Sequence, residues 1–241
     1  MSISSIYKFV RKTSPLGDYR NNSFVGHFIS SQISPFFTYF FIKKSVIPNV
    51  ITVFMILSGI IGAILFSVDN IYIKIVGVIF INLWFIFDCS DGEVARITKK
   101  FSSMGKEIDF AAHIINHPLF FISIVLTVYQ FYGYDELLIY PVIIIGVLDV
   151  FYRGIASLDL IYNIKFKKEV VNKKDRIGFI RYVVSNGTKT PNFVIFTPLL
   201  LIFDYATGFN LMLYYTFFTL FIMVLIIPRV IYYTVKKFVN C

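Results

Sequence analysis

The stretch VITVFMILSGIIGAILFSV, residues 50–68, contains no charged side chain. It is long enough to cross the hydrocarbon core of a membrane, which takes about 20 apolar residues as a helix. The whole chain of 241 residues is 57% hydrophobic and only 15% charged, so it has too few polar residues to cover a soluble globule. The sequence therefore predicts an integral membrane protein.

Further apolar runs of similar length follow the first one. Together they predict an all-α, polytopic membrane protein with six transmembrane helices. The expected spans are residues 50–68, 71–89, 107–130, 135–162, 190–206 and 209–235.

Basic residues are distributed unevenly between the connections. The first, third and fifth connections, on one side, are short, and with their edges they carry Asp69, Lys74, Asp135, Glu136 and Asp204. The other side has an excess of lysine and arginine, which marks the cytoplasmic face. The pattern predicts an integral protein of the cell membrane with both termini in the cytoplasm. The net charge of +9 is then explained by membrane topology, so nucleic acid is not expected to be a binding partner. These basic residues are Lys8, Arg11, Lys12, Arg20, Lys43, Lys44, Arg96, Lys99, Lys100, Lys106, Lys165, Lys167, Lys168, Lys173, Lys174, Arg176, Arg181, Lys189, Arg229, Lys236 and Lys237.

The segment before the first span is amphipathic. Residues 24–44 mix aromatic with polar side chains, which predicts a helix at the membrane interface, with Ser34 as N-cap and Pro35 as the first helical residue. We expect residues 1–49 to form a cytoplasmic and interfacial segment and residues 50–241 to form one membrane domain. A simple anchoring role for the interfacial helix remains open.

A set of acidic residues stands where the second and third spans meet the cytoplasm. Residues 87–117 read FDCSDGEVARITKKFSSMGKEIDFAAHIINH. Asp88 and Asp91 are three residues apart and share one helix face, and Asp109 on the next span can close over them. Ionisable groups at a membrane boundary are costly and usually functional. Three carboxylates form a hard-cation site, with Mg²⁺ the first choice and Mn²⁺ or Ca²⁺ as substitutes.

Glycine and arginine accompany these carboxylates. Gly92 removes a side chain where a ligand can approach the backbone, and Gly105 is expected to let the third span pack tightly against the second. Arg96, one turn after Gly92, can make bidentate contacts to a phosphate. Arg96 can equally be a flanking residue of the positive-inside rule.

Asp109, His113 and His117 recur every four residues and therefore share one face of the third span. The face brings a candidate base toward the carboxylates. His117, followed by a proline, is interpreted as a hydrogen-bonded packing residue.

The fourth span is interrupted by charged residues. Asp149 and Arg153 are one turn apart and can pair within the helix, and Asp159 follows them. Alternatively, Arg153 together with Arg181 grips the phosphate or polyol of an acceptor. Both interpretations stay open at this point.

The combined motif Asp88-x2-Asp91-Gly92-x2-Ala95-Arg96-x8-Gly105-x3-Asp109-x3-His113 resembles the signature of the CDP-alcohol phosphotransferase family, which includes phosphatidyltransferases. The resemblance implies a membrane enzyme that transfers a substituted phosphate from a CDP-linked donor to a hydroxyl acceptor and releases CMP. It also implies a role in phospholipid or phospho-glycoconjugate biosynthesis, and homodimers are common in the family.

The resemblance also assigns roles to residues. It implies that Asp88, Asp91 and Asp109 hold one or two divalent ions, Mg²⁺ or Mn²⁺. The same resemblance implies a pocket for the CDP portion of the donor. Its lining residues would be Pro48, Asn49, Thr52, Gly92, Arg96 and Ser102.

One motif position departs from the family. The last position is an aspartate in the family, where it ligates metal and deprotonates the acceptor, and here it is His113. A neutral imidazole can also take a proton near physiological pH and bind a metal. We therefore expect His113 to be metal ligand and general base. The alternatives are a catalytically impaired protein that binds a CDP compound or lipid, and a small transporter whose polar pathway uses these residues.

Overall fold

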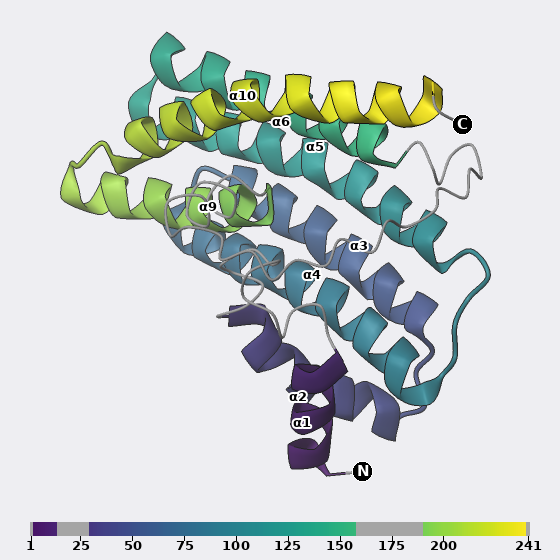
Figure 1. Ribbon diagram of the computed structural model, residues 1–241. Coiled ribbons are helices and arrows are strands. Elements are labelled where there is room, and N and C mark those ends of the chain that lie inside the picture. Colours follow the sequence, from purple (N-terminus) through teal and green to yellow (C-terminus); the bar gives the residue numbers. More distant parts are fainter. Residues whose placement is uncertain (1, 14–28, 158–189, 240–241) are drawn as a thin grey trace.

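The computed structural model describes residues 2–13, 29–157 and 190–239, nearly all of which lie in helices. The described residues form helices and no strands, which confirms the prediction of an all-helical polytopic membrane protein (Figure 1). Within the described residues the helices are α1 (Ile3–Thr13), α2 (Ser31–Lys43), α3 (Pro48–Ser67), α4 (Ile71–Thr98), α5 (Gly105–Tyr132), α6 (Glu136–Ala156), α9 (Thr190–Thr207) and α10 (Leu211–Val239).

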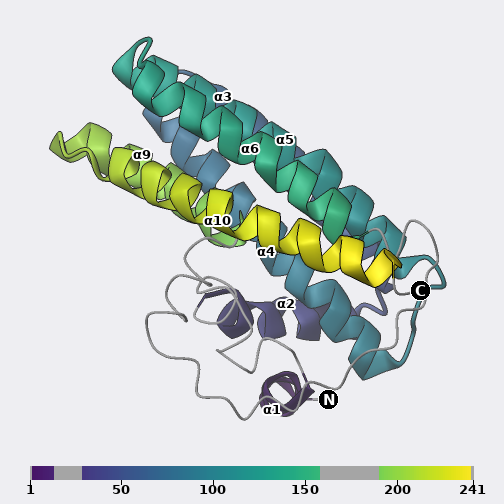
Figure 2. The same ribbon diagram turned by 45° about the horizontal axis from the view of Figure 1, so that its top comes forward.

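Five of these helices, α3, α4, α5, α6 and α10, are long and apolar enough to cross a membrane. The apolar part of α9, Pro191–Thr207, is shorter. Each predicted span corresponds to one of these six helices, although several boundaries differ. The short connections α3–α4, α5–α6 and α9–α10 lie at one end of the bundle, and the connection α4–α5 lies at the other end with the last turn of α10 (Figures 1 and 2).

Capping groups explain several helix ends. Pro48 is the first residue of α3, where its missing N–H needs no partner. The side chain of Asn70 accepts hydrogen bonds from the backbone N–H groups of Tyr72 and Ile73, at 2.9 and 3.2 Å, and so starts α4. Asp135 caps α6 in the same way through Leu137, at 2.9 Å. These polar residues lie at the ends of the apolar runs and set their limits.

Helix α4 continues well past residue 89, where the sequence places the end of the second span. It ends at Thr98, followed by Lys99 in a left-handed backbone conformation with φ of 56°. Arg96 was expected in the connection after this span, but it lies in the last turns of α4. Asp88, Asp91 and Arg96 therefore project from one rigid element.

Glycines let α3 and α4 approach each other closely. A Cβ atom added to Gly77 would lie 2.6 Å from the backbone nitrogen of Phe66, and one added to Gly62 would lie 2.9 Å from that of Ile81. Backbone atoms cannot move aside easily, so only glycine fits these two positions. By contrast, a Cβ at Gly105 would meet Ser102 at an ordinary 3.6 Å, so the expectation of close packing at Gly105 was wrong.

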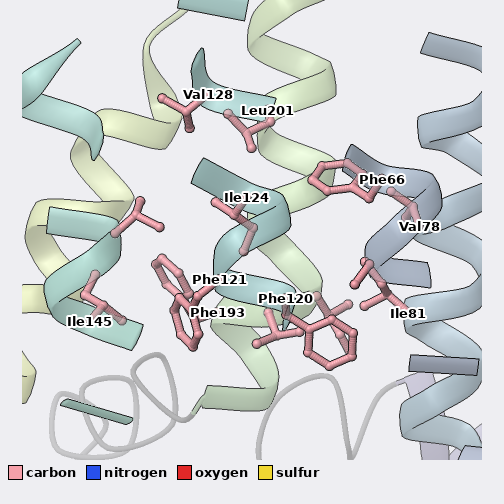
Figure 3. Close-up of a cluster of buried hydrophobic side chains, with 14 of the residues drawn as sticks. Phe66, Val78, Ile81, Phe120, Phe121, Ile124, Val128, Ile145, Phe193 and Leu201 are labelled. Atoms are coloured by element: carbon pink, nitrogen blue, oxygen red, sulfur yellow. The ribbon is translucent and has the colours of Figure 1, made fainter. Parts of the chain in front are cut away.

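Helix α5 lies in the middle of the apolar core. Figure 3 shows its residues Phe120, Phe121, Ile124 and Val128 between side chains from the neighbouring helices. The neighbours in the same core cluster include Phe66, Val78, Ile81, Ile145, Phe193 and Leu201. Helix α5 packs against α3, α6 and α9. Near its start, Nε2 of His113 lies 3.4 Å from Oδ1 of Asp88 on α4.

The N-terminal segment differs from its prediction. The described part of the interfacial segment is helix α2, which begins at Ser31, so Ser34 is not an N-cap and Pro35 lies inside the helix. Ser34 is buried and donates a 2.6 Å hydrogen bond to the Glu93 carboxylate on α4, a stronger interaction than a cap. Thr38 donates to the other oxygen of Glu93 at 2.6 Å. Polar side chains therefore fix α2 against α4.

Two ionisable residues expected at exposed edges are buried. Lys74 is 0% and Asp204 2% exposed. Asp204 accepts hydrogen bonds from the backbone of Leu211 and Met212, at 3.1 and 2.7 Å, and caps α10. Both side chains therefore contribute to packing inside the bundle and do not lie at its exposed edges.

Candidate functional site

The acidic residues at the end of α4 face the first turns of α5. The Nε2 atom of His113 lies 3.4 Å from Oδ1 of Asp88 and 3.6 Å from Oδ1 of Asp109. One ligand atom from each of the three residues lies within 4.8 Å of the other two. The third span thus closes over the second as its sequence predicts, and it brings two carboxylates and an imidazole together.

Asp91 takes a different partner. Its Oδ2 accepts a 2.7 Å hydrogen bond from the Thr52 hydroxyl on α3, and Thr52 also reaches the carbonyl oxygen of Pro48 at 3.3 Å. Among the described residues, the three-residue cluster of ligand atoms does not include Asp91. Asp91 instead ties the acidic end of α4 to the first turn of α3.

Residues expected around the donor come from three elements that meet here. The side-chain amide of Asn49 donates to the Ser102 hydroxyl at 3.2 Å. A Cβ atom on Gly92 would lie 3.0 Å from a terminal nitrogen of Arg96, so the arginine side chain folds back over the glycine. The buried Nε of Arg96 has no hydrogen-bond partner within the described residues. Arg96 therefore places a positive charge next to the acidic residues, and its Nε–H group is available to donate a hydrogen bond.

A second string of polar contacts leads from His113 into the bundle. Nδ1 of His113 lies 3.3 Å from Nε2 of His117, and Nδ1 of His117 lies 2.7 Å from Oδ2 of Asp149. Arg153 donates from Nε to the same oxygen at 3.2 Å. His117 and Asp149 are both 0% exposed. The structure shows the predicted pairing of Asp149 with Arg153, and His117 is hydrogen-bonded as expected.

Trp84 packs against the two histidines of this string of polar contacts. Its ring meets the rings of His113 and His117 edge-on, with centroids 5.6 and 5.3 Å apart, and packs against Phe120 at 5.0 Å. The side chain of Trp84 is fully buried. It fixes both imidazoles sterically.

Three features of this region were not predicted from the sequence: the contact of His117 with Asp149, the position of Trp84 and the role of Glu93. The contact of His117 with Asp149 joins α5 to α6, and no local spacing signals it. Trp84, the chain's single tryptophan, gave a compositional signal only. Glu93 stands inside the motif, but its role as acceptor for Ser34 and Thr38 depends on the placement of α2.

Two residues named in the sequence analysis, Arg181 and Asp159, lie outside the described residues. Cys89 is buried beside the motif, as a free cysteine. The roles assigned to the site residues remain predictions.

Comparison with known families gives one match. A family model described as CDP-alcohol phosphatidyltransferase matches residues 45–228. The matched part runs from just before α3 into α10 and contains the whole described site. No curated protein matches the chain.

Proposed function

The chain belongs to the CDP-alcohol phosphatidyltransferase family, and from this membership and the geometry of its site we propose that it transfers a substituted phosphate from a CDP-linked donor to a hydroxyl acceptor with release of CMP. The observation that carries this proposal is the convergence of Asp88, Asp109 and His113 within 4.8 Å at the end of α4. Either CDP-diacylglycerol or a CDP-linked small alcohol fits as donor. The product would enter phospholipid or phospho-glycoconjugate biosynthesis.

The converging side chains fit a divalent cation. Two carboxylates and an imidazole are oxygen and nitrogen ligands that Mg²⁺ or Mn²⁺ accepts alongside phosphate oxygens. We propose that Asp88 and Asp109 hold one ion and that Asp91 joins them or holds a second. His113 would ligate the ion only while its single Nε2 lone pair is not accepting the proton of the acceptor hydroxyl. A bound ion would supply charge neutralisation for the diphosphate of the donor.

The residues next to this cluster are suited to hold the CDP portion. Arg96 offers charged N–H donors for phosphate oxygens, and Gly92 keeps the α4 backbone open beneath it. Pro48, Asn49 and Thr52 from α3 and Ser102 from the α4–α5 connection contribute neutral polar groups. We assign these six residues to the donor.

His113 is proposed as the general base. Nε2 takes the proton of the acceptor hydroxyl, whose oxygen forms a bond to the phosphorus distal to cytidine. The bond from that phosphorus to the bridging oxygen breaks, and CMP leaves with the electron pair. Arg96 stabilises the charge that develops on the leaving phosphate.

The acceptor is proposed to bind on the α6 side. Arg153 uses Nε for Asp149, and its terminal nitrogens can bind a phosphate or polyol. Arg181 is proposed to join it. We further propose that both termini face the cytoplasm, that the protein resides in the cell membrane, and that it forms a homodimer.

The test is nucleotide binding in detergent, because it requires no knowledge of the acceptor. CDP and CMP should bind the purified protein with Mg²⁺ and should not bind with chelator. Asp88→Ala should abolish this binding, and His113→Ala should largely retain it while CMP release falls about 100-fold or more.

Three other results have distinct meanings. Absence of nucleotide binding under every condition would overturn the proposed function and favour a transporter. Binding without CMP release from any donor would indicate a catalytically impaired binding protein. Full turnover by His113→Ala would remove His113 from the role of base.

A further inference from the structure

In the chain of contacts from His113 through His117 to Asp149, chemistry determines which atom donates each hydrogen bond and which accepts it. An ionised carboxylate accepts hydrogen bonds and cannot donate them. At 2.7 Å from Oδ2 of Asp149, Nδ1 of His117 must therefore carry the hydrogen. Asp149 and Arg153 already form a neutral pair, and a further charge on the fully buried ring of His117 would lack compensation. His117 is thus neutral, and its Nε2 is an acceptor.

The hydrogen on Nδ1 of His117 also determines the hydrogen-bond direction at the next ring, that of His113. Since Nε2 of His117 accepts, Nδ1 of His113, 3.3 Å away, is the donor. A neutral imidazole carries one hydrogen, so Nε2 of His113 then presents a lone pair. This lone pair points at Oδ1 of Asp88 and Oδ1 of Asp109.

Distances at the open end agree with this assignment. Nε2 of His113 lies 3.4 and 3.6 Å from the two carboxylate oxygens, which are ion-pair distances rather than hydrogen bonds, whereas the 3.3 Å contact of its Nδ1 with His117 has hydrogen-bond geometry. An N–H on Nε2 would be expected to shorten at least one of these distances. Three groups that only accept thus converge, and they need a cation or the hydroxyl proton of an acceptor.

We propose that Asp149 and His117 are positioning residues that set the tautomer and ring orientation of His113, so that Nε2 is unprotonated and faces the reacting groups. Asp149 selects Nδ1–H on His117, and His117 selects Nδ1–H on His113. Trp84, packed edge-on against both rings, prevents them from turning. A buried aspartate that orients the base histidine of a Ser-His-Asp triad has the same effect.

This arrangement gives the departure from the family motif a physical basis. An aspartate at position 113 would need no partner to present a lone pair, because both its oxygens accept. A histidine must be held in one of two tautomers, and the residues that do so lie one turn further along α5 and on α6. The inference rests on the proposed function for the use of the lone pair, but the tautomer itself is independent of it.

The test is ¹⁵N NMR of the full-length protein in detergent with labelled histidine. The chain has three histidines, His27, His113 and His117, so single His→Gln variants assign the signals. The shifts of the ring nitrogens separate a protonated from a bare nitrogen. His113 and His117 should both show Nδ1–H and bare Nε2 without any substrate.

Asp149→Leu removes the acceptor at the end of the string. We expect the His113 signals to move toward the other tautomer. The kcat for CMP release should fall at least about tenfold while the KM for the donor stays within about twofold, because the six residues assigned to the donor are untouched and Arg153, which loses its partner, is assigned to the acceptor. Asp204→Leu is the matched control, since it removes another buried aspartate at the far end of the bundle. It should lower the thermal midpoint and leave the His113 tautomer and kcat unchanged.

Two results would overturn the inference: Nε2–H on His113 in the unsubstituted protein, or an unchanged His113 tautomer in Asp149→Leu. If Asp149→Leu does not fold, the spectrum of the unsubstituted protein still decides. Failure of the unsubstituted protein to release CMP would contradict the proposed function, while the measured tautomer would still test this inference.

Discussion

The two ends of α4 treat buried charge in opposite ways. Near its start, the ammonium group of Lys74 is fully buried and donates to the carbonyl oxygen of Phe66, to Thr127 and to Gln130, at 2.8, 3.0 and 2.5 Å. It also lies 5.3 Å from the centroids of two phenyl rings, those of Phe66 and Phe131. The Lys74 ammonium group thus uses all three of its N–H donors, and these hydrogen bonds link α3, α4 and α5.

Near the end of α4 the charges face one another instead. Asp88 and Asp109 converge on one imidazole edge at 3.4 and 3.6 Å. Like charges in a partly buried site repel each other. When no cation is bound, this repulsion lowers the stability of this end of the helix. The difference indicates that the Lys74 end serves folding and the Asp88 end serves binding and chemistry. Stability and activity should therefore respond separately to substitutions at the two ends.

The largest effect is expected for Asp88→Asn. Removing one of the converging charges should lower CMP release by about 10³-fold or more, because a cation ligand is lost. Without divalent ions, the thermal midpoint of this variant should equal or exceed that of the unsubstituted protein, because repulsion is relieved. Differential scanning fluorimetry in detergent and a CMP-release assay measure the two quantities.

Added Mg²⁺ sharpens this contrast. It should raise the midpoint of the unsubstituted protein, since a ligand that binds only the folded state stabilises it, and it should raise that of Asp88→Asn much less. If Asp88→Asn lowered the midpoint by several degrees without metal, Asp88 would be a structural residue and the comparison would fail.

Much of this organisation was predictable because it depends on local pattern. Apolar runs of membrane-spanning length predicted the helices. The spacing of Asp88 and Asp91, with Asp109 on the next span, predicted that these faces meet, and they do so for Asp88 but not for Asp91, which bonds to Thr52. The one-turn spacing of Asp149 and Arg153 predicted their pairing. In each case the relevant distance in sequence is a few residues or a single helical connection.

The remaining features depend on tertiary placement. Ser34 bonds to Glu93 across 59 residues and His117 to Asp149 across 32, so neither partner is readable from spacing. Lys74 looked like a flanking cation because nothing local shows the acceptors that α3 and α5 supply. Helix α4 extends beyond its apolar stretch, and the contacts of Ser34 and Thr38 with Glu93 in this extension come from α2.

A smaller effect is expected where α3 and α4 touch. Gly77→Ala places a Cβ 2.6 Å from backbone nitrogen, so the helices must separate, at a cost of about 1–3 kcal/mol. Gly154→Ala on α6 is the matched control, because nothing lies within 4 Å of its added Cβ. The thermal midpoint should fall for Gly77→Ala and stay level or rise for Gly154→Ala. Equal midpoints would show that the α3–α4 contact is looser than described.

The smallest effect is expected at the Lys74 end itself. Lys74→Met shortens the side chain by one atom, removes the cost of burying a charge and leaves the Phe66 carbonyl, Thr127 and Gln130 with one partner fewer. These terms oppose each other, and Thr127 still donates to the Phe66 carbonyl at 2.9 Å, so we expect a net loss of only about 1 kcal/mol. The thermal midpoint should drop slightly, while kcat per folded protein stays unchanged. A fall in kcat without a fall in midpoint would mean that the two ends of α4 are coupled, and the division of labour between them would have to be abandoned.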